Sequence, residues 1–155
     1  MSDQPNQIPS SFLYLGILII SGIAGILVLV TDFGGVYNNY GGYYVWEFIG
    51  ILNFPYNLII IAIAGFFFYN LVISLMALKD SDNPVPSNLF TIGFFLNIAA
   101  LSLVILGAIA LGIVGGLEAD DWWFDAGFYG GIIGGIINLI LYFLLISNRE
   151  VSISF

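Results

Sequence analysis

The chain has 155 residues, of which 60% are hydrophobic and only 8% charged, so it has too little polar surface to cover a soluble globule and is expected in a membrane. Ten acids against two bases give a formal net charge of -8, which excludes nucleic-acid binding because such binding needs a basic surface. Cysteine and histidine are absent, which removes disulfides and the commonest protein ligands of zinc, copper and haem, so no cofactor is expected.

Long uncharged segments define the fold class. Residues 4–31, 48–78, 83–117 and 126–148 contain no Asp, Glu, Lys or Arg. Each exceeds the ~18 residues that mark a transmembrane helix candidate. The opening residues lack the basic region of a secretory signal peptide, so the first segment is expected to remain in the mature protein.

These segments predict helices at about 11–30, 56–78, 89–115 and 127–147. The expected fold is an all-α integral membrane protein, a single membrane domain of four transmembrane helices. The helices should form two tandem hairpins that pack as a four-helix bundle.

The first helix and the loop after it carry small and aromatic residues. Gly22 and Gly25 are candidate helix-packing positions. The loop is rich in Gly, Asn and Tyr, and its aromatic residues suit the headgroup level of a membrane interface. The candidate belt residues in this loop are Tyr43, Tyr44 and Trp46.

The second, third and fourth helices each contain an asparagine, namely Asn70, Asn97 and Asn138. An amide in hydrocarbon needs a partner, and interhelical hydrogen bonds average only ~0.6 kcal/mol, so these residues are expected to tie helices together. No ionisable residue stands at the middle of a span, which argues against a proton-coupled or charge-selective carrier.

The stretch "EADDWWFDAGFYGG", residues 118–131, precedes the fourth helix. Its acids favour a short loop in water, and Trp122 and Trp123 are expected to join the interface belt. A weaker possibility is a hard-cation site with carboxylate ligands, although the spacing does not match an EF-hand loop. That site would use Asp120, Asp121 and Asp125 together with Asp32 or Glu47.

Glycines at a helical spacing mark one face of the fourth helix. Gly127, Gly131 and Gly135 recur at every fourth position, with Gly130 and Gly134 in a second row beside them. Such a face lets a neighbouring backbone approach closely. The neighbour could be another helix of the same chain or a second subunit.

Two bases suggest the topology and two short motifs suggest a repeat. Lys79 and Arg149 follow the second and fourth helices, so the positive-inside rule places both termini in the cytoplasm and the acidic loops outside.

"PSSFLYLG" and "PSNLFTIG" align without a gap, which suggests repeat halves at 9–80 and 86–150. Alternatively, any two-helix membrane hairpin starts polar and ends basic.

The helix number, the order of a longer and a shorter external loop and the short internal turn resemble the tetraspan plan of claudins and their relatives. The W-x-x-W-C-C type signature of the claudin first loop is replaced by "YYVWEF", and the Cys-rich loop of tetraspanins is absent. No residue is therefore carried over from either family.

We expect a non-catalytic protein: a structural or accessory subunit of a larger membrane assembly, such as a respiratory complex, a cell-surface lattice or an enveloped virion. Its expected partners are membrane lipid and other membrane subunits or further copies of itself. The alternative is a small oligomeric channel or transporter for cations or small neutral solutes, with the external acids at its mouth.

Overall fold

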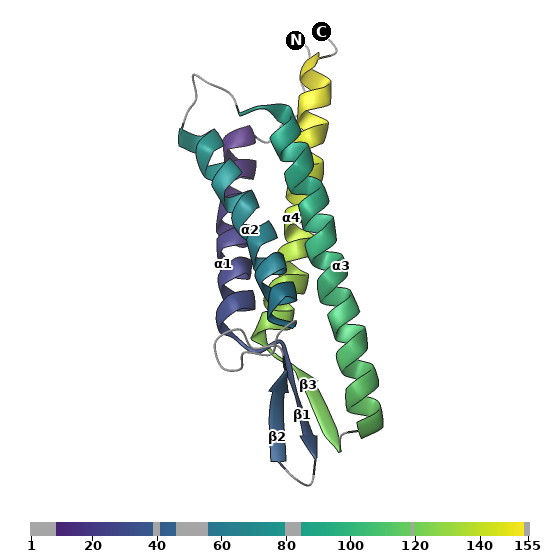
Figure 1. Cartoon of the computed structure of the whole chain (residues 1–155). Coiled ribbons are helices and arrows are strands. Elements are labelled where there is room, and N and C mark those ends of the chain that lie inside the picture. The colour runs from purple at the N-terminus through teal and green to yellow at the C-terminus, as the bar shows by residue number, and fades with distance from the viewer. Residues whose placement is uncertain (1–8, 39–40, 46–55, 80–84, 119, 154–155) are drawn as a thin grey trace.

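The computed structural model describes residues 9–38, 41–45, 56–79, 85–118 and 120–153. The elements in chain order are α1 (Ser10–Val30), β1 (Gly34–Asn38), β2 (Gly41–Val45), α2 (Tyr56–Lys79), α3 (Ser87–Glu118), β3 (Asp121–Phe124) and α4 (Ala126–Ile153) (Figure 1). The four predicted helices are confirmed, and all four are long and apolar enough to cross a membrane. The largest difference in bounds is at the end of α4, six residues beyond the prediction of 147.

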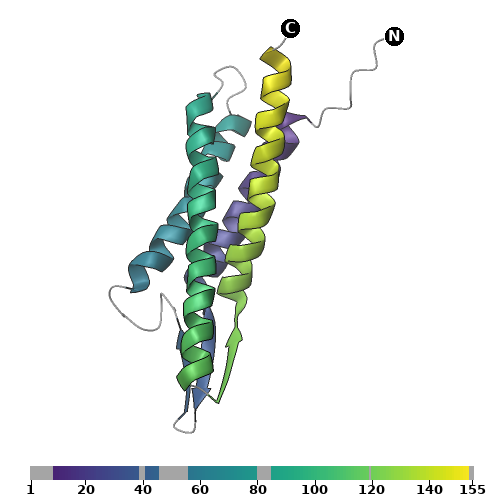
Figure 2. The same cartoon turned by 90° about the vertical axis from the view of Figure 1, so that its right-hand side faces the viewer.

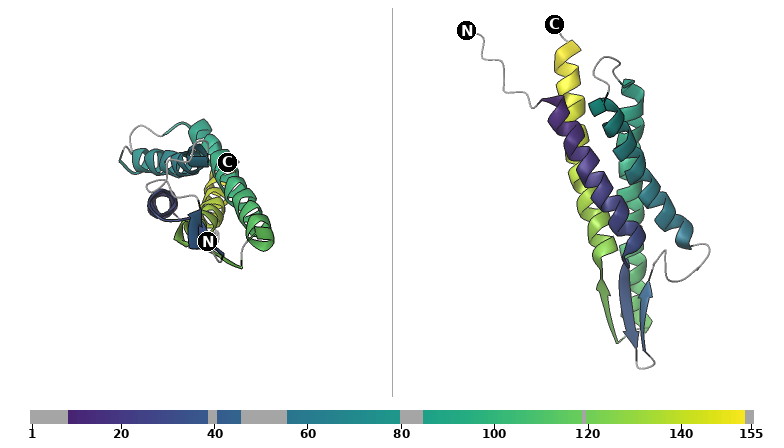
Figure 3. Two further views of the ribbon diagram at one scale, coloured as in Figure 1. Left: turned by 60° about the horizontal axis from the view of Figure 1, so that its bottom comes forward. Right: turned by 90° about the vertical axis from the view of Figure 1, so that its left-hand side faces the viewer.

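The four helices pack side by side. α1 contacts α2 and α4, and α3 contacts the same two helices from the other side (Figure 3). α1 and α3 start at the same end of the molecule, and α2 and α4 finish there, while the strands lie at the opposite end (Figure 1). We call this opposite end the sheet side.

Large apolar side chains cover the outside of the helices. Phe12, Ile23, Phe95, Leu106 and Phe143 are each more than half exposed. A helix that is hydrophobic all round needs apolar surroundings on every face, which the hydrocarbon core of a bilayer supplies.

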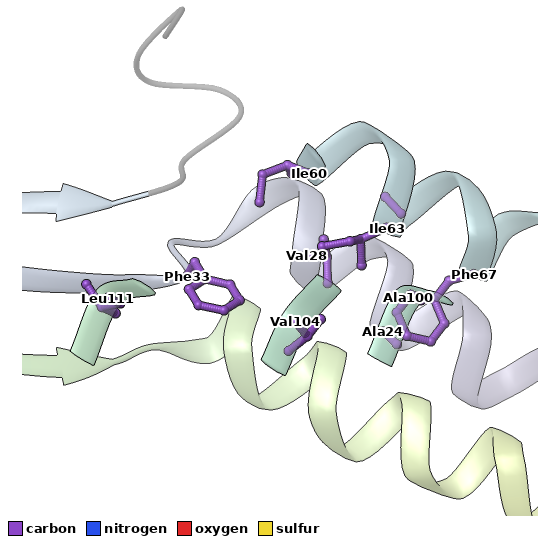
Figure 4. Packing of buried hydrophobic residues seen from close by; sticks show 10 residues of the cluster. Ala24, Val28, Phe33, Ile60, Ile63, Phe67, Ala100, Val104 and Leu111 are labelled. Carbon is purple, nitrogen blue, oxygen red and sulfur yellow. The ribbon is translucent and has the colours of Figure 1, made fainter. Parts of the chain in front are cut away.

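The buried apolar residues form two separate groups. The sheet-side cluster contains Ala24, Val28, Phe33, Ile60, Ile63, Ala64, Phe67, Ala100, Val104 and Leu111 (Figure 4). The far-side cluster contains Leu13, Ile17, Ile73, Val85, Phe90, Tyr142 and Leu145. The helices are therefore held by two hydrophobic contacts at different heights along their length.

A three-stranded antiparallel sheet amends the all-α expectation. The strand order is β2-β1-β3, so the two segments expected as irregular loops pair with each other (Figure 2). In this register Val36 of β1 lies opposite Tyr43 on one side and Trp122 on the other. The sheet joins the first connection to the third and extends beyond α1, α2 and α4.

Glycines allow the sheet to dock on the end of α3. A Cβ atom at Gly115 would lie 2.5 Å from Cγ of Trp122, so this indole packs directly on the α3 backbone. A Cβ atom at Gly34 of β1 would lie 2.5 Å from Cδ2 of Leu111. Trp123 points to the other face of the sheet, as alternation in a strand requires, and its indole covers Gly35.

Aromatic rings connect the sheet to α4. The rings of Trp122 and Phe124 meet edge to face, with their centroids 5.4 Å apart. Phe124 stacks on Phe128 with a centroid separation of 4.0 Å. Phe128 in turn meets Phe33, a member of the sheet-side cluster, at 5.5 Å. Contacts of this kind add about 0.5–1.5 kcal/mol each to the burial of the rings. The sheet is thus continuous with the core of the helices.

The docking of the sheet on α3 can be tested with two adjacent glycines. We expect Gly115→Ala to lower the melting temperature and shift tryptophan emission to longer wavelength, because the new methyl group displaces the Trp122 indole. Gly116→Ala is the matched control: a Cβ there has nothing within 4 Å, and alanine favours the helix by up to about 1 kcal/mol. Equal melting curves for the two variants would show that Trp122 does not fix the sheet.

Candidate functional site

A polar layer separates the two hydrophobic clusters. In α1, α2 and α3 a buried polar residue stands between residues of the two clusters, and in α4 it stands between Tyr142 of the far-side cluster and Ile132, which packs against the sheet-side cluster. The four residues are Ser21 of α1, Asn70 of α2, Asn97 of α3 and Asn138 of α4, and each has an exposed fraction of 0%. Ser21, Asn70 and Asn138 lie near the middle of their helices, so this layer is at mid-height in the apolar part of the molecule.

Hydrogen bonds join α4 to each of the other three helices at this layer. Asn138 Nδ2 donates to Ser21 Oγ of α1 at 2.8 Å. The Tyr142 hydroxyl donates to Asn70 Oδ1 of α2 at 2.7 Å. Asn97 Nδ2 of α3 donates to the backbone carbonyl of Gly135 at 2.8 Å. Residues 135, 138 and 142 are three and four apart, so they lie along one side of α4.

Four buried side-chain atoms in the layer or close to it have no hydrogen-bond partner among the described residues. They are Asn70 Nδ2, Ser74 Oγ, Asn97 Oδ1 and Asn138 Oδ1. All belong to neutral amides and hydroxyls, which do not ionise near neutral pH and cannot carry charge or serve as strong general acids or bases. The chemistry of the layer therefore suits structural ties between helices.

Gly93 and Tyr142 complete the contact with Asn70 and were not among the residues predicted from the sequence. A Cβ atom at Gly93 would collide with the Tyr142 hydroxyl and would lie 2.7 Å from Asn70 Oδ1, so glycine is what admits this pair. Tyr142 itself is completely buried. The available signal was a tyrosine four residues after Asn138, on the same face of the helix.

The glycines of α4 divide their contacts between two neighbouring helices. Cβ atoms at Gly130 and Gly134 would meet Leu27 and Ala24 of α1, and one at Gly127 would meet the Asp32 carbonyl just beyond α1. Those at Gly131 and Gly135 would meet Val104 and Leu101 of α3, at 2.7 and 3.1 Å. All five glycines are thus occupied by contacts within the chain.

The candidate packing glycines of α1 face α2. A Cβ atom at Gly22 would lie 3.2 Å from Leu71, and one at Gly25 would lie 3.1 Å from Phe68. These distances are similar to the 3.1 Å at Gly135 and longer than the 2.7 Å at Gly130 and Gly131 of α4.

The acids at the sheet side have local roles. Asp125 Oδ1 accepts a hydrogen bond from the backbone N–H of Ala126 at 2.7 Å and caps α4, where the helix dipole favours a negative charge. Asp121 Oδ1 accepts one from the Trp122 N–H at 2.8 Å. Within the described residues, no three acids come together as a metal site, and Glu47 of the suggested cation site lies outside them.

The residues expected in the interface belt lie in different parts of the sheet or outside the described residues. Trp122 and Trp123 are 37% and 36% exposed and also pack on the α3 end and on β1. Tyr43 and Tyr44 belong to β2, with backbones paired to β1, and Trp46 lies outside the described residues.

The hydrogen bond between α4 and α2 can be tested by removing one hydroxyl. We expect Tyr142→Phe to lower the free energy of unfolding by about 1 kcal/mol, because Asn70 Oδ1 then loses its donor in a buried site. Unfolding in mixed detergent micelles measures this change. Tyr129→Phe, at a tyrosine that is 51% exposed, should leave the value unchanged. An equal effect of both substitutions would show that the hydrogen bond between Tyr142 and Asn70 does not contribute to the free energy of unfolding.

The close approach of α4 to α3 can be tested at one glycine. Gly131→Leu should prevent normal packing, because even the first carbon would lie 2.7 Å from Val104. Gly65→Leu is the control in α2, where a Cβ has nothing within 4 Å. Size-exclusion profiles and melting temperatures in detergent measure the difference. Unchanged folding of the Gly131 variant would show that this contact is dispensable.

Comparison of the chain with protein-family models, with curated proteins and with solved structures finds no match in any of the three.

Proposed function

We propose that the chain is a four-span integral membrane protein whose helices form a four-helix bundle of two hairpins. In this proposal it serves as a non-catalytic structural or accessory subunit of a larger membrane assembly. The observation that carries the proposal is the filled interior, with a hydrophobic cluster on each side of a polar layer that contains no Asp, Glu, Lys or Arg.

The filled interior argues against conduction through a single bundle. Phe33 and Phe67 on the sheet side, with Phe90 and Leu145 on the far side, are at most 2% exposed. A path for ions needs polar or charged groups that replace their hydration shell along its whole length. A pore would thus have to form between several copies, with Asp120 and Asp121 near its mouth.

Charge supports an orientation with the sheet outside the cell. Lys79 ends α2 at the far side, and Arg149 lies in the last part of α4. The chain has no other Lys or Arg, whereas Asp120, Asp121 and Asp125 lie at the sheet side. The positive-inside rule then places the far side in the cytoplasm.

A partner would find two kinds of surface on this protein. The first is the lipid-facing side of the helices, because the α4 glycines are used within the chain. The second is the sheet, in which β2 and β3 each pair on one side only within the described residues. Unpaired strand edges offer backbone donors and acceptors to another chain.

The assembly proposal is tested by the mass of the protein extracted from its native membrane. In a mild detergent we expect a defined complex that contains a second subunit in fixed stoichiometry, well above the 16.9 kDa of one chain. Harsher detergent should release the single chain in folded form, because its core is complete. Recovery of the single chain alone, even after crosslinking in intact membranes, would contradict the proposal.

The channel alternative is tested with purified protein in liposomes. We expect no flux of potassium, sodium or a small neutral solute above that of empty liposomes, since each bundle is filled. A pore-forming peptide in the same liposomes provides the positive control. Flux that scales with protein content and falls in Asp120→Asn/Asp121→Asn would favour the channel.

A further inference from the structure

α1 and α4 lie side by side (Figure 3). An open apolar groove of about 320 Å³ runs between them on the sheet-side half of the two helices. Ala24, Gly130 and Gly134 form its floor. Ile23 of α1 and Ile133 of α4 stand on its two walls, 54% and 52% exposed, so the groove opens to the outside of the bundle. The floor is deep because the glycines bring the two helices together and add no side chains of their own.

The length of the groove matches one leaflet of a bilayer. Along α4 it extends from Ala126 to Ile137, which is about 16 Å at a rise of ~1.5 Å per residue. A hydrocarbon core is about 30 Å thick, so one leaflet is about 15 Å deep. The groove ends beside Asn138 and Ser21, at the polar layer in the middle of the bundle.

The volume of the groove fits one hydrocarbon chain. From carbon contact distances, an extended chain about 5 Å wide and 16 Å long occupies roughly 300 Å³. A helix of the same length and about 10 Å diameter occupies roughly 1,200 Å³, so only one ridge of it could enter. A groove of about 320 Å³ therefore has room for one acyl chain but not for a whole helix of a second copy.

Charge at the open end of the groove selects the headgroup. Asp125 directly precedes Ala126, which lines the groove, and the backbone carbonyl of Asp32 contacts Gly127, so both acidic residues belong to this end of the groove. Both bases of the chain belong to the opposite half of the molecule. A lipid with a positively charged ammonium group is attracted to these carboxylates, whereas a lipid with net negative charge is repelled. Tyr129, at the same end and 51% exposed, offers an aromatic face to an ammonium group.

We propose that the α1–α4 groove binds one acyl chain of a phosphatidylethanolamine molecule from the leaflet on the sheet side, with the ammonium group near Asp125. This inference rests on the membrane placement of the proposed function.

The site is tested by lipid retention in native mass spectrometry of the full chain. Wild-type protein in detergent, given phosphatidylethanolamine or phosphatidylglycerol with the same acyl chains, should retain one phosphatidylethanolamine and at least fivefold less phosphatidylglycerol. Ile23→Ala/Ile133→Ala removes both walls and should reduce retention at least fivefold. Equal retention by this variant, or equal retention of the two lipids, would overturn the proposal.

A matched pair of isoleucines controls for general loss of apolar surface. Ile26→Ala/Ile136→Ala changes the same residue type on the same two helices, at positions 53% and 48% exposed that do not line the groove. This variant should retain phosphatidylethanolamine as the wild type does. The wall variant and the control should also melt at similar temperatures, which separates loss of the site from loss of the fold.

A second copy in the groove would give a different result. The chain has no cysteine, so Ile133→Cys introduces a single thiol. We expect little disulfide dimer in oxidised membranes, and efficient dimer formation would show that another copy fills the groove and overturn the lipid proposal. Resistance of the wild type to alkaline extraction from membranes tests the membrane placement separately.

Discussion

The structure depends on three hydrogen bonds through which α4 holds the other three helices at one height. In lipid, the hydrophobic effect does not draw helices together, so packing contacts and interhelical hydrogen bonds must do so. The bonds from Asn138 to Ser21, from Tyr142 to Asn70 and from Asn97 to Gly135 fix α4 against each neighbour in register. A slip of one residue along any helix would move apolar groups against these buried amides. The polar layer thus specifies the register of the helices, which the two hydrophobic clusters alone would specify only weakly.

The positions of the helices could be predicted because their signal is local. Long uncharged stretches fix the number of helices, and their bounds follow within a few residues except at the end of α4. Asn70, Asn97 and Asn138 stand out for the same reason, as isolated amides in apolar sequence. Their partners could not be predicted, because Ser21 and Asn138 are 117 positions apart and meet only when the helices pack.

The sheet was missed because its evidence is spread over distant parts of the chain. β1, β2 and β3 have only four or five residues each, and β1 and β2 begin with paired glycines, which disfavour strands in isolation. Their stability comes from pairing across the molecule and from contacts such as Trp122 on Gly115 of α3. The adjacent tryptophans at 122 and 123 indicate a membrane interface when read locally. In the fold, each of them also covers a glycine from a different element.

The length of α3 has a mechanical consequence. Its 32 residues extend about 48 Å, well beyond a hydrocarbon core of about 30 Å, and the overhanging end carries the sheet (Figure 1). The same helix holds Asn97 at mid-height and Leu111 and Gly115 at the sheet, without an intervening loop. α3 is therefore a continuous helical link between the polar layer and the sheet, which lie about 20 Å apart along the helix.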